Sequence, residues 1–372
     1  MTLKSSILMN NLALITGSLP FRNRSFLFRN LCLAASFLFL MPVVYGANRY
    51  WVAAATANWS SPLNWSTSSG GAGGAGVPGT ADRVYFDNGG PGNCTIDLPV
   101  SISRIDVLAS YTGTISQGAN TITISGVANF GGGIFAGGSA DIIITGNFTN
   151  SGTAFTSTSG TLEFNNNVDL TGGAFSHNNG SVRLNSISGN LILNGNSPVL
   201  YNLELVGNGN AYNFTNSGDV TVSHALSITG TSYCRINGSA IDVTGDINIS
   251  NTATGGGGNG QINLNGTGTQ LINGATAAGF GALPQFNINS SGTVNLTGFI
   301  SFAIGFVYTA GTVNPGTSTV CFTNTGTNSY DISGVLTLNN VVFLTGSTSL
   351  KRNFPAGSVL TVTGTLTMDG SN

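Results

Sequence analysis

The chain has 372 residues, of which 54 are glycine, and charged residues make up 6% of it, against about 25% in an average globular domain. Apolar residues account for 41%, which is enough for a core and excludes disorder driven by charge. The formal net charge of −2 also excludes a strongly basic nucleic-acid-binding protein.

Residues 1–46 have the pattern of an export signal. Positive charges come first, at Lys4, Arg22, Arg24 and Arg29. The apolar run that follows, residues 31–45, is shorter than the ~20 residues that span a bilayer, which favours a signal peptide. Val44 and Gly46 suit signal peptidase, so we expect cleavage before Ala47 and a secreted or cell-surface protein. An uncleaved membrane anchor is the alternative.

Removal of this segment leaves a weakly acidic chain. Four of the 11 basic residues are lost with it, so seven remain against 13 acidic residues. Such a surface offers no basic groove for phosphates, and we predict no nucleic-acid partner. Contact with a membrane is expected only through the export signal.

Residues 47–100 are predicted to form an N-terminal cap. They contain all three tryptophans of the chain, Trp51, Trp59 and Trp65, followed by a glycine-rich stretch. The end of a repeat structure exposes sheet edges that have to be covered, and terminal units are atypical for that reason. Large aromatic side chains that close the first coil fit this role. Stacking of an exposed tryptophan on a glycan is the alternative function for these three residues.

Residues 101–372 are organised by a repeat of about 20 residues, which is strictest at its start. The segments 121–125, 141–145, 161–165 and 181–185 read TITIS, DIIIT, TLEFN and SVRLN. Apolar and polar residues alternate within each segment, which indicates strands with one buried face. The apolar columns with this step are Ile122, Ile142, Leu162 and Val182; Ile124, Ile144, Phe164 and Leu184; and Phe135, Phe155 and Phe175.

A unit of this length can hold three short strands with tight turns, and it buries its apolar face only by stacking on its neighbours. The sequence therefore predicts an all-β protein, a parallel β-helix (β-solenoid) of about 20–24 residues per coil, with superimposed positions about 4.8 Å apart. About 11–13 such coils would form one domain, in place of the two or three that the length suggests. An antiparallel sandwich or propeller is disfavoured, because hairpins would place reversed patterns next to each other.

This geometry makes two predictions about side chains. Cys94, Cys234 and Cys321 lie about seven and four coils apart, beyond the ~7 Å between Cα atoms that a disulfide allows, so no intrachain disulfide is expected. Glu163 and Arg183 should lie on adjacent coils, where they could form an ion pair.

The cap resembles a known family in a series of short motifs: YWV at 50–52, ANW at 57–59, NWS at 64–66, a glycine-rich loop, VP at 77–78 and D-x-V-x-F at 82–86. Together they are similar to the opening of secreted bacterial parallel β-helix surface proteins, which are autotransporter-passenger-like or adhesin-like. The GGAF and HNNGSVRL segments within 172–184 look like the repeats of that family. The resemblance implies export, a β-helix and a surface location, and it carries over no catalytic residue. Because such proteins often end in a translocator or sorting domain, and the chain stops within a repeat at Asn372, we expect it to be truncated at the C-terminus.

Few residues could carry catalysis. His177 and His224 lie at a predicted turn and corner, where a polar turn residue is the simpler interpretation. Asp219, Asp242 and Asp246 are the candidate catalytic acids, because β-helix polysaccharide hydrolases place carboxylates on neighbouring coils and the first two are about one coil apart in the sequence. Aspartate at the start of a strand also bonds nearby backbone, which is the structural interpretation.

No cofactor or metal is predicted. The glycine cluster at 255–263 (GGGGNGQIN) lacks the aspartate of a calcium-binding nonapeptide, and no P-loop lysine follows any glycine cluster. The outward columns also lack the regular threonine lattice that ice binding would need.

These features together predict an exported cell-surface or extracellular protein with a structural or adhesin-like role and no catalytic activity. Its Ser, Thr and Asn side chains would face glycans or surface proteins, and no obligate oligomer is inferred. The alternative is a carbohydrate-active enzyme, a polysaccharide hydrolase or lyase, on the same scaffold.

Overall fold

The structure is a computed structural model and describes residues 46–186, 190–209, 212–323, 330–344 and 352–369. The predicted export signal, except for its last residue, lies outside these ranges, so its cleavage stays a prediction. Within the described ranges, no helix is long and apolar enough to cross a membrane.

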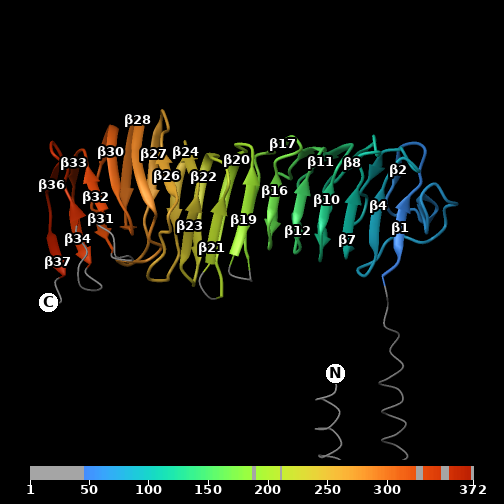
Figure 1. Ribbon diagram of the computed structural model, residues 1–372, viewed down its shortest axis with the longest axis horizontal. Coiled ribbons are helices and arrows are strands. Elements are labelled where there is room, and N and C mark those ends of the chain that lie inside the picture. The colour runs from blue at the N-terminus through green and yellow to red at the C-terminus, as the bar shows by residue number, and fades with distance from the viewer. Residues whose placement is uncertain (1–45, 187–189, 210–211, 324–329, 345–351, 370–372) are drawn as a thin grey trace, which may run out of the picture. The chain divides into compact units, whose positions relative to one another are not determined.

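The chain from Gly46 onward winds into a parallel β-solenoid of about 13 turns, with β1 (Asn48–Trp51) at one end and β37 (Leu366–Asp369) at the other (Figure 1). This confirms the predicted fold class. Each of the early coils contributes one short strand to each of three sheets, as the length of the repeat allows.

Three long sheets form the walls of the solenoid. The first contains β1, β3 (Trp65–Ser66), β4 (Arg83–Phe86), β7 (Arg104–Val107), β10 (Ala128–Phe130), β13 (Phe148–Asn150), β16 (Val168–Leu170), β19 (Asn190–Gly195), β21 (Tyr212–Asn216) and β23 (Cys234–Gly238). The second contains β2 (Ala57–Asn58), β5 (Cys94–Thr95), β8 (Thr114–Ser116), β11 (Ile134–Ala136), β14 (Ala154–Thr156) and β17 (Phe175–Ser176).

The third sheet contains β6 (Val100–Ile102), β9 (Ile122–Ile124), β12 (Ile142–Ile144), β15 (Thr161–Phe164), β18 (Ser181–Leu184), β20 (Val199–Gly207), β22 (Val220–Gly230), β24 (Ala240–Val243), β25 (Asp246–Ile249), β26 (Gln261–Leu264), β27 (Thr269–Asn273), β28 (Gln285–Thr297), β30 (Phe306–Asn314), β32 (Tyr330–Ser333) and β35 (Arg352–Asn353). Two short sheets join β29 (Phe299–Phe302), β31 (Thr319–Phe322), β34 (Asn340–Leu344) and β37, and β33 (Val335–Leu338) with β36 (Val359–Val362). A 3₁₀ turn, η1 (Pro62–Asn64), lies in the cap.

Neighbouring coils pair in parallel with the predicted columns in register. Ile142 lies opposite Ile122 on one side and opposite Leu162 on the other. Phe135 lies opposite Phe155 in the second sheet, with ring centroids 4.6 Å apart and planes 9° from parallel. The sequence repeat is therefore one turn of the solenoid.

The step lengthens in later coils. Val182 lies opposite Leu203, and Leu203 lies opposite Leu226, so each of these turns is longer than the one between Leu162 and Val182. The register between β20 and β22 shifts at a bulge, and both strands are much longer than those of the first coils. Strands and corners therefore absorb the additional residues while the inward columns continue.

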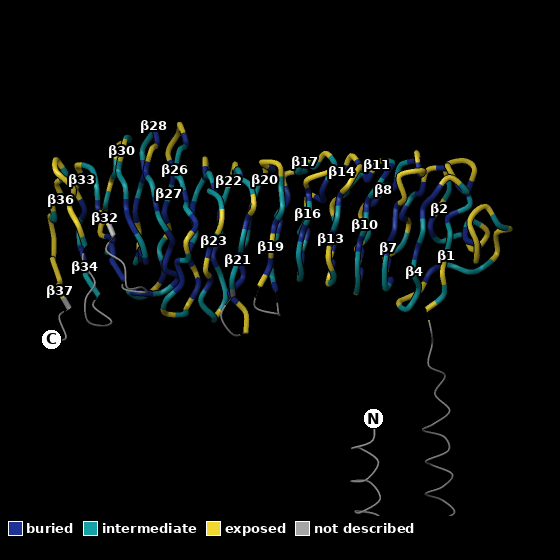
Figure 2. Tube along the Cα trace, viewed as in Figure 1, coloured by how far each residue is buried: buried dark blue, intermediate teal, exposed yellow. Residues whose placement is uncertain are grey.

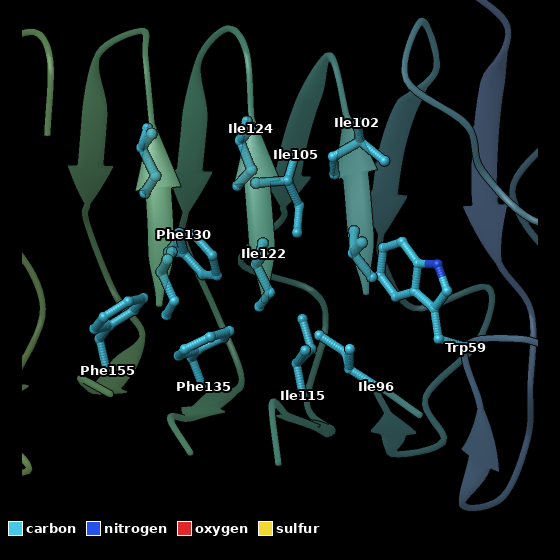
Figure 3. A pocket seen from close by; sticks show the side chains of 13 residues that line it. Trp59, Ile96, Ile102, Ile105, Ile115, Ile122, Ile124, Phe130, Phe135 and Phe155 are labelled. Carbon is cyan, nitrogen blue, oxygen red and sulfur yellow. The ribbon is translucent and has the colours of Figure 1, made fainter. Parts of the chain in front are cut away.

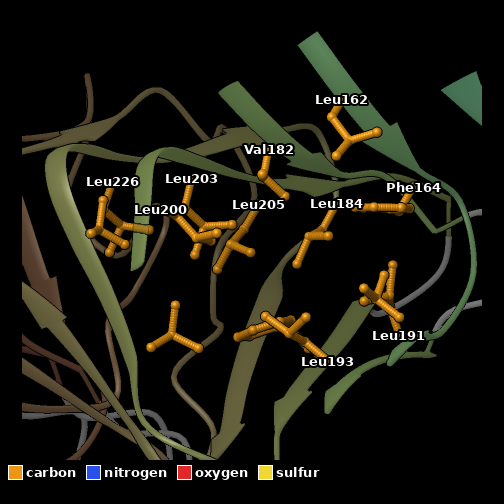
Figure 4. Packing of buried hydrophobic residues seen from close by; sticks show 14 of the residues in the cluster. Leu162, Phe164, Val182, Leu184, Leu191, Leu193, Leu200, Leu203, Leu205 and Leu226 are labelled. Carbon is orange, nitrogen blue, oxygen red and sulfur yellow. The ribbon is translucent and has the colours of Figure 1, made fainter. Parts of the chain in front are cut away.

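The interior is a continuous apolar core. Buried residues alternate with more exposed ones along the strands, coil after coil (Figure 2). Figure 4 shows leucine, valine and phenylalanine side chains from neighbouring coils, among them Leu184, Leu203 and Leu226, packed into this interior. Each such side chain contributes about 1.5–3 kcal/mol through its burial. This apolar stacking, rather than charge pairing, stabilises a chain with so few charges.

Buried amide side chains fasten the corners of successive coils. Gln270 donates to the carbonyls of Val243 and Gly245, at 3.2 and 2.7 Å, and accepts from the N–H of Gly266 at 3.0 Å. A buried carbonyl without a partner is costly, so an inward amide at a corner stabilises the turn. The same role is filled by Gln117, Asn150, Asn216 and Asn251.

The N-terminal end is closed by the tryptophan-rich region. Trp51, Trp59 and Trp65 are at most 1% exposed and pack edge to face, with the Trp59 and Trp65 rings 4.6 Å apart. The indole N–H of Trp51 donates to the carbonyl of Gly92 at 2.9 Å. Strand β3 pairs antiparallel with β1 and covers the free edge of the first sheet. This arrangement is the N-terminal cap that the sequence predicts.

The cysteines Cys94, Cys234 and Cys321 are buried free thiols on β5, β23 and β31. They lie on separate coils, as the repeat spacing predicts. Burial raises the pKa of each thiol, and it raises that of Cys234 to about 12.

Candidate functional site

Asp242, one of the three candidate acids, is the last acceptor in a ladder of amides on the outer face of the third sheet. Its carboxylate accepts from the side-chain amide of Asn263 at 2.8 Å. Asn263 in turn accepts from Asn287 at 2.9 Å, and Asn287 accepts from Gln285 at 3.3 Å. These residues stack on β24, β26 and β28. The carboxylate is therefore held as a structural acceptor between coils.

The other two candidate acids bind backbone of the next coil. Asp219 accepts from the N–H of Ala240 at 3.0 Å, and Asp246 accepts from the N–H of Leu271 at 2.8 Å. The alignment of β22 with β24 places Asp219 beside Ala240 and not beside Asp242. Asp219 and Asp242 therefore lie on neighbouring coils but not directly opposite each other, because the coil is shorter than their spacing in the sequence.

The three tryptophans do not offer a binding surface for glycans. With exposures of 0%, 1% and 0%, Trp51, Trp59 and Trp65 have no ring face in solvent. A sugar stacks on an aromatic side chain only where the ring is accessible. The alternative of glycan stacking at these residues is therefore corrected to a packing role.

The two histidines lie on either side of Tyr201. The ring of His224 stacks on that of Tyr201 at 4.5 Å, with planes 11° from parallel, and the ring of His177 lies 5.7 Å away on the other side. His224 Nδ1 is 2.8 Å from the side-chain oxygen of Asn202. No serine and acid complete a Ser/His/Asp triad in these contacts, so both histidines act as stacking and hydrogen-bonding residues at a corner.

An interior cavity in the first coils is too small and too apolar to bind a substrate. A gap of about 20 Å³ in the first coils is lined only by apolar side chains, from Trp59 at one end to Phe155 at the other (Figure 3). It holds at most one water and offers no polar partner, so it is a packing gap of the core. Across the described residues, no three His, Cys, Asp or Glu side chains gather as metal ligands would.

A group of charged and aromatic side chains lies on the outer face of the first sheet, on β1, β4 and β7. We call it the Tyr–Arg patch and define it as Tyr50, Arg83, Tyr85, Arg104 and Asp106. Pairing of β1 with β4 places Tyr50 opposite Tyr85, and pairing of β4 with β7 places Arg83 opposite Arg104 and Tyr85 opposite Asp106. The patch is therefore built by stacking of three consecutive strands.

Asp106 is the centre of this patch. Arg104 donates to it through Nε at 2.7 Å and Nη2 at 2.8 Å, Arg83 through Nε at 3.0 Å, and Asn129 through its amide at 2.8 Å. Burial by itself raises the pKa of Asp106, but the hydrogen bonds from Arg104, Asn129 and Arg83 outweigh it and hold the pKa below its ordinary value. The carboxylate is therefore charged and orients two arginines.

The tyrosines of the Tyr–Arg patch form a stacked pair. The rings of Tyr50 and Tyr85 are 4.7 Å apart and 10° from parallel. The guanidinium of Arg83 lies 5.0 Å from the centroid of the Tyr85 ring, a distance at which a cation is attracted to an aromatic face. Tyrosine and arginine are the residue types that recur at binding hot spots.

A second charged column lies on the third sheet. Arg183 pairs with Glu163 at 3.7 Å and with Glu204 at 3.4 Å, on the coils before and after it. The predicted pair of Glu163 and Arg183 is confirmed, and the additional partner Glu204 follows from the same register. Glu163 also accepts from Asn165 and Asn185, and Glu204 from Thr229, so neither glutamate is left as an available acid.

Sequence reasoning missed the Tyr–Arg patch. Its two tyrosines are far apart in the sequence, because a long excursion through the cap separates β1 from β4, and the repeat step does not relate them. One signal was available in the composition: three of the seven basic residues that follow residue 46 are Arg49, Arg83 and Arg104. In a chain so poor in charge, this clustering could have indicated the site.

Comparisons with protein-family models, with curated proteins and with solved structures find no significant match to this chain.

Proposed function

We propose that this protein is an exported, non-catalytic solenoid of the cell surface or extracellular space, which presents its outward side chains to glycans or to surface proteins. The observation that carries the proposal is the amide ladder from Gln285 to Asp242, which runs across three coils of the outer face. Its side chains are fixed by one another and remain partly exposed. A rigid array of donors and acceptors suits the hydroxyl groups of a glycan, since little side-chain freedom is lost on binding.

The roles of the aspartates support binding over catalysis. A general acid or base has to exchange protons with a substrate, whereas Asp219, Asp242 and Asp246 accept hydrogen bonds from the next coil.

Export is supported by the charge and apolar pattern of residues 1–46 and by the resemblance of the cap to secreted bacterial β-helix proteins. Sequencing the N-terminus of protein recovered from the culture medium or the cell surface tests this part. We expect the mature chain to begin at Ala47. Recovery only from the cytoplasm, with Met1 intact, would contradict it.

A glycan array probed with the purified protein tests the binding function. We expect at least one class of glycan to bind. For a glycan that binds at the amide ladder, the double substitution of Asn263→Ala and Asn287→Ala should lower the affinity about tenfold, because two fixed polar contacts are lost. Asn208→Ala, in an exposed turn after β20, is the matched control and should leave binding unchanged. Absence of binding to every glycan and to a panel of surface proteins would overturn the proposal.

A further inference from the structure

We propose that the Tyr–Arg patch binds the carboxylate of an acidic glycan, such as a polymer of uronic acids. The inference rests on the proposed function, because it names a ligand class for one part of the same outward surface. The unused donors of Arg83, the residues that orient them and the pairing of the strands below support it.

The terminal amino groups of Arg83 are available as hydrogen-bond donors. Only its Nε is hydrogen-bonded, to Asp106, and neither terminal amino group has a partner among the described residues. The side chain is 40% exposed. Arg104, 32% exposed, uses Nε and Nη2 on Asp106 and leaves Nη1 free. A guanidinium with both terminal amino groups available can hold a carboxylate through two parallel hydrogen bonds.

The donors of Arg83 are held in place before any ligand arrives. Asp106 fixes the Nε edge of the guanidinium at 3.0 Å, and the ring of Tyr85 lies against it, 5.0 Å from its centre. Tyr85 is itself stacked on Tyr50. An arginine that is already oriented loses less conformational entropy on binding than a freely rotating one.

The local charge favours an anion. Arg83 and Arg104 share one carboxylate, so the patch carries one positive charge in excess. The neighbouring pair of Arg49 and Asp82, 3.3 Å apart, adds none. The column around Arg183 has the opposite balance, because two glutamates flank one arginine. The Tyr–Arg patch therefore has a charge balance that attracts a carboxylate, whereas the column around Arg183 does not.

The sheet below the patch favours a glycan over an acidic peptide. An extended peptide is held mainly by backbone hydrogen bonds to the free edge of a sheet. Here β4 is paired on both sides, with β1 and β7, and β1 and β7 are covered in turn by β3 and β10. Side chains alone can therefore contact a ligand, and guanidinium, phenol and amide groups match carboxylates and hydroxyls.

Titration of the full-length protein with tetragalacturonic acid, followed by calorimetry, tests the inference. We expect binding to the wild type that weakens in high salt, and Arg83→Ala to lower the affinity about ten- to hundredfold. Arg83→Lys should be nearly as weak, because it keeps the charge and loses the planar fork. Arg235→Ala is the matched control, since Arg235 also lies 5.0 Å from a tyrosine ring but shares no carboxylate with a second arginine; it should bind like the wild type.

Two further ligands separate the possible outcomes. The methyl ester of the tetrasaccharide and a hexaglutamate peptide should both bind at least tenfold more weakly than the acid. Equal binding of the ester, equal binding of hexaglutamate, unchanged affinity in folded Arg83→Ala protein, or no binding of the acid at millimolar concentration would each overturn the inference. If the inference fails but neutral glycans still bind on the array, the proposed function is retained. If no glycan binds at all, glycan binding is contradicted together with the inference.

Discussion

Arg83 and Arg104 lie directly opposite each other on neighbouring parallel strands, and both donate to the carboxylate of Asp106. Like charges in this position repel each other. The shared carboxylate, which is 6% exposed, compensates both. The stacking that produces the fold therefore also brings these three charged side chains together on its outer face.

Removing this carboxylate should destabilise the protein. We expect Asp106→Asn to lower the free energy of unfolding by about 2–3 kcal/mol, because the carboxylate is buried while the two guanidiniums are partly solvated. Chemical denaturation measures the change. Asp219→Asn, an exposed position where the amide oxygen can still accept from Ala240, is the control and should differ from the wild type by less than about 0.5 kcal/mol. Equal stability of the two variants would contradict the central role of Asp106.

The same carboxylate should make stability depend on pH. Burial raises the pKa of Asp106, but the hydrogen bonds from Arg104, Asn129 and Arg83 have a larger, opposite effect, so the net pKa is below its ordinary value. The pKa of Asp82 is also lowered on balance. A carboxyl whose pKa is lower in the folded state stabilises the fold above the ordinary carboxyl pKa of about 4 and loses this contribution as the pH falls through the folded value. When the melting temperature is measured from pH 7 to pH 2, it should stay nearly constant down to about pH 4 and decrease at lower pH. The Asp106→Asn variant should show a smaller decrease. An identical pH profile for the variant would refute the assignment.

Buried amide side chains at the corners should contribute more to the free energy of unfolding than outward amide side chains. Gln270→Ala leaves the carbonyl of Gly245 and the N–H of Gly266 without the partner that Gln270 supplies, whereas the carbonyl of Val243 keeps the N–H of Asn265. We expect a loss of about 2–4 kcal/mol in the free energy of unfolding, measured by chemical denaturation. Gln261→Ala removes an outward amide of the same kind, bonded to Asn263, and should cost less than about 1 kcal/mol. The reverse order of the two effects would show that the corners do not depend on these amides.

The buried thiols should be unreactive in the folded protein. Burial raises the pKa of Cys234 to about 12 and also raises that of Cys94 and Cys321, and the thiolate is the reactive form. A thiol reagent at pH 8 should leave all three unmodified until denaturant is added, and then label them fully. Rapid labelling without denaturant would show that the coils around them open.

The early coils could be predicted from the sequence because stacking repeats the same chemistry at a fixed step. Ile122, Ile142 and Leu162 follow each other at the step of the repeat and do lie opposite one another. Later coils vary in length, since strands and corners take up additional residues without disturbing the inward columns. The alignment of Asp219 with Ala240 instead of Asp242 depends on such a small difference in coil length.

The candidate site was less accessible to sequence reasoning. Tyr50 and Tyr85 stack although most of the cap lies between them in the sequence, and only the pairing of β1 with β4 brings them together. The sequence also did not determine whether the tryptophans are buried, because Trp59 is compatible both with a buried cap residue and with an exposed residue that stacks on a glycan. The structure shows that it is buried. Local pattern therefore predicts the coil, whereas contacts across the cap require the three-dimensional structure.

The most direct test of a non-catalytic, glycan-binding solenoid is a sedimentation assay of the purified protein with a panel of insoluble polysaccharides, in which released reducing ends are measured in the same samples. We predict that the protein sediments with at least one polysaccharide and that reducing ends stay at the level of the protein-free control. Release of reducing ends that Asp242→Asn abolishes would contradict a non-catalytic role, and failure to sediment with any polysaccharide would contradict glycan binding.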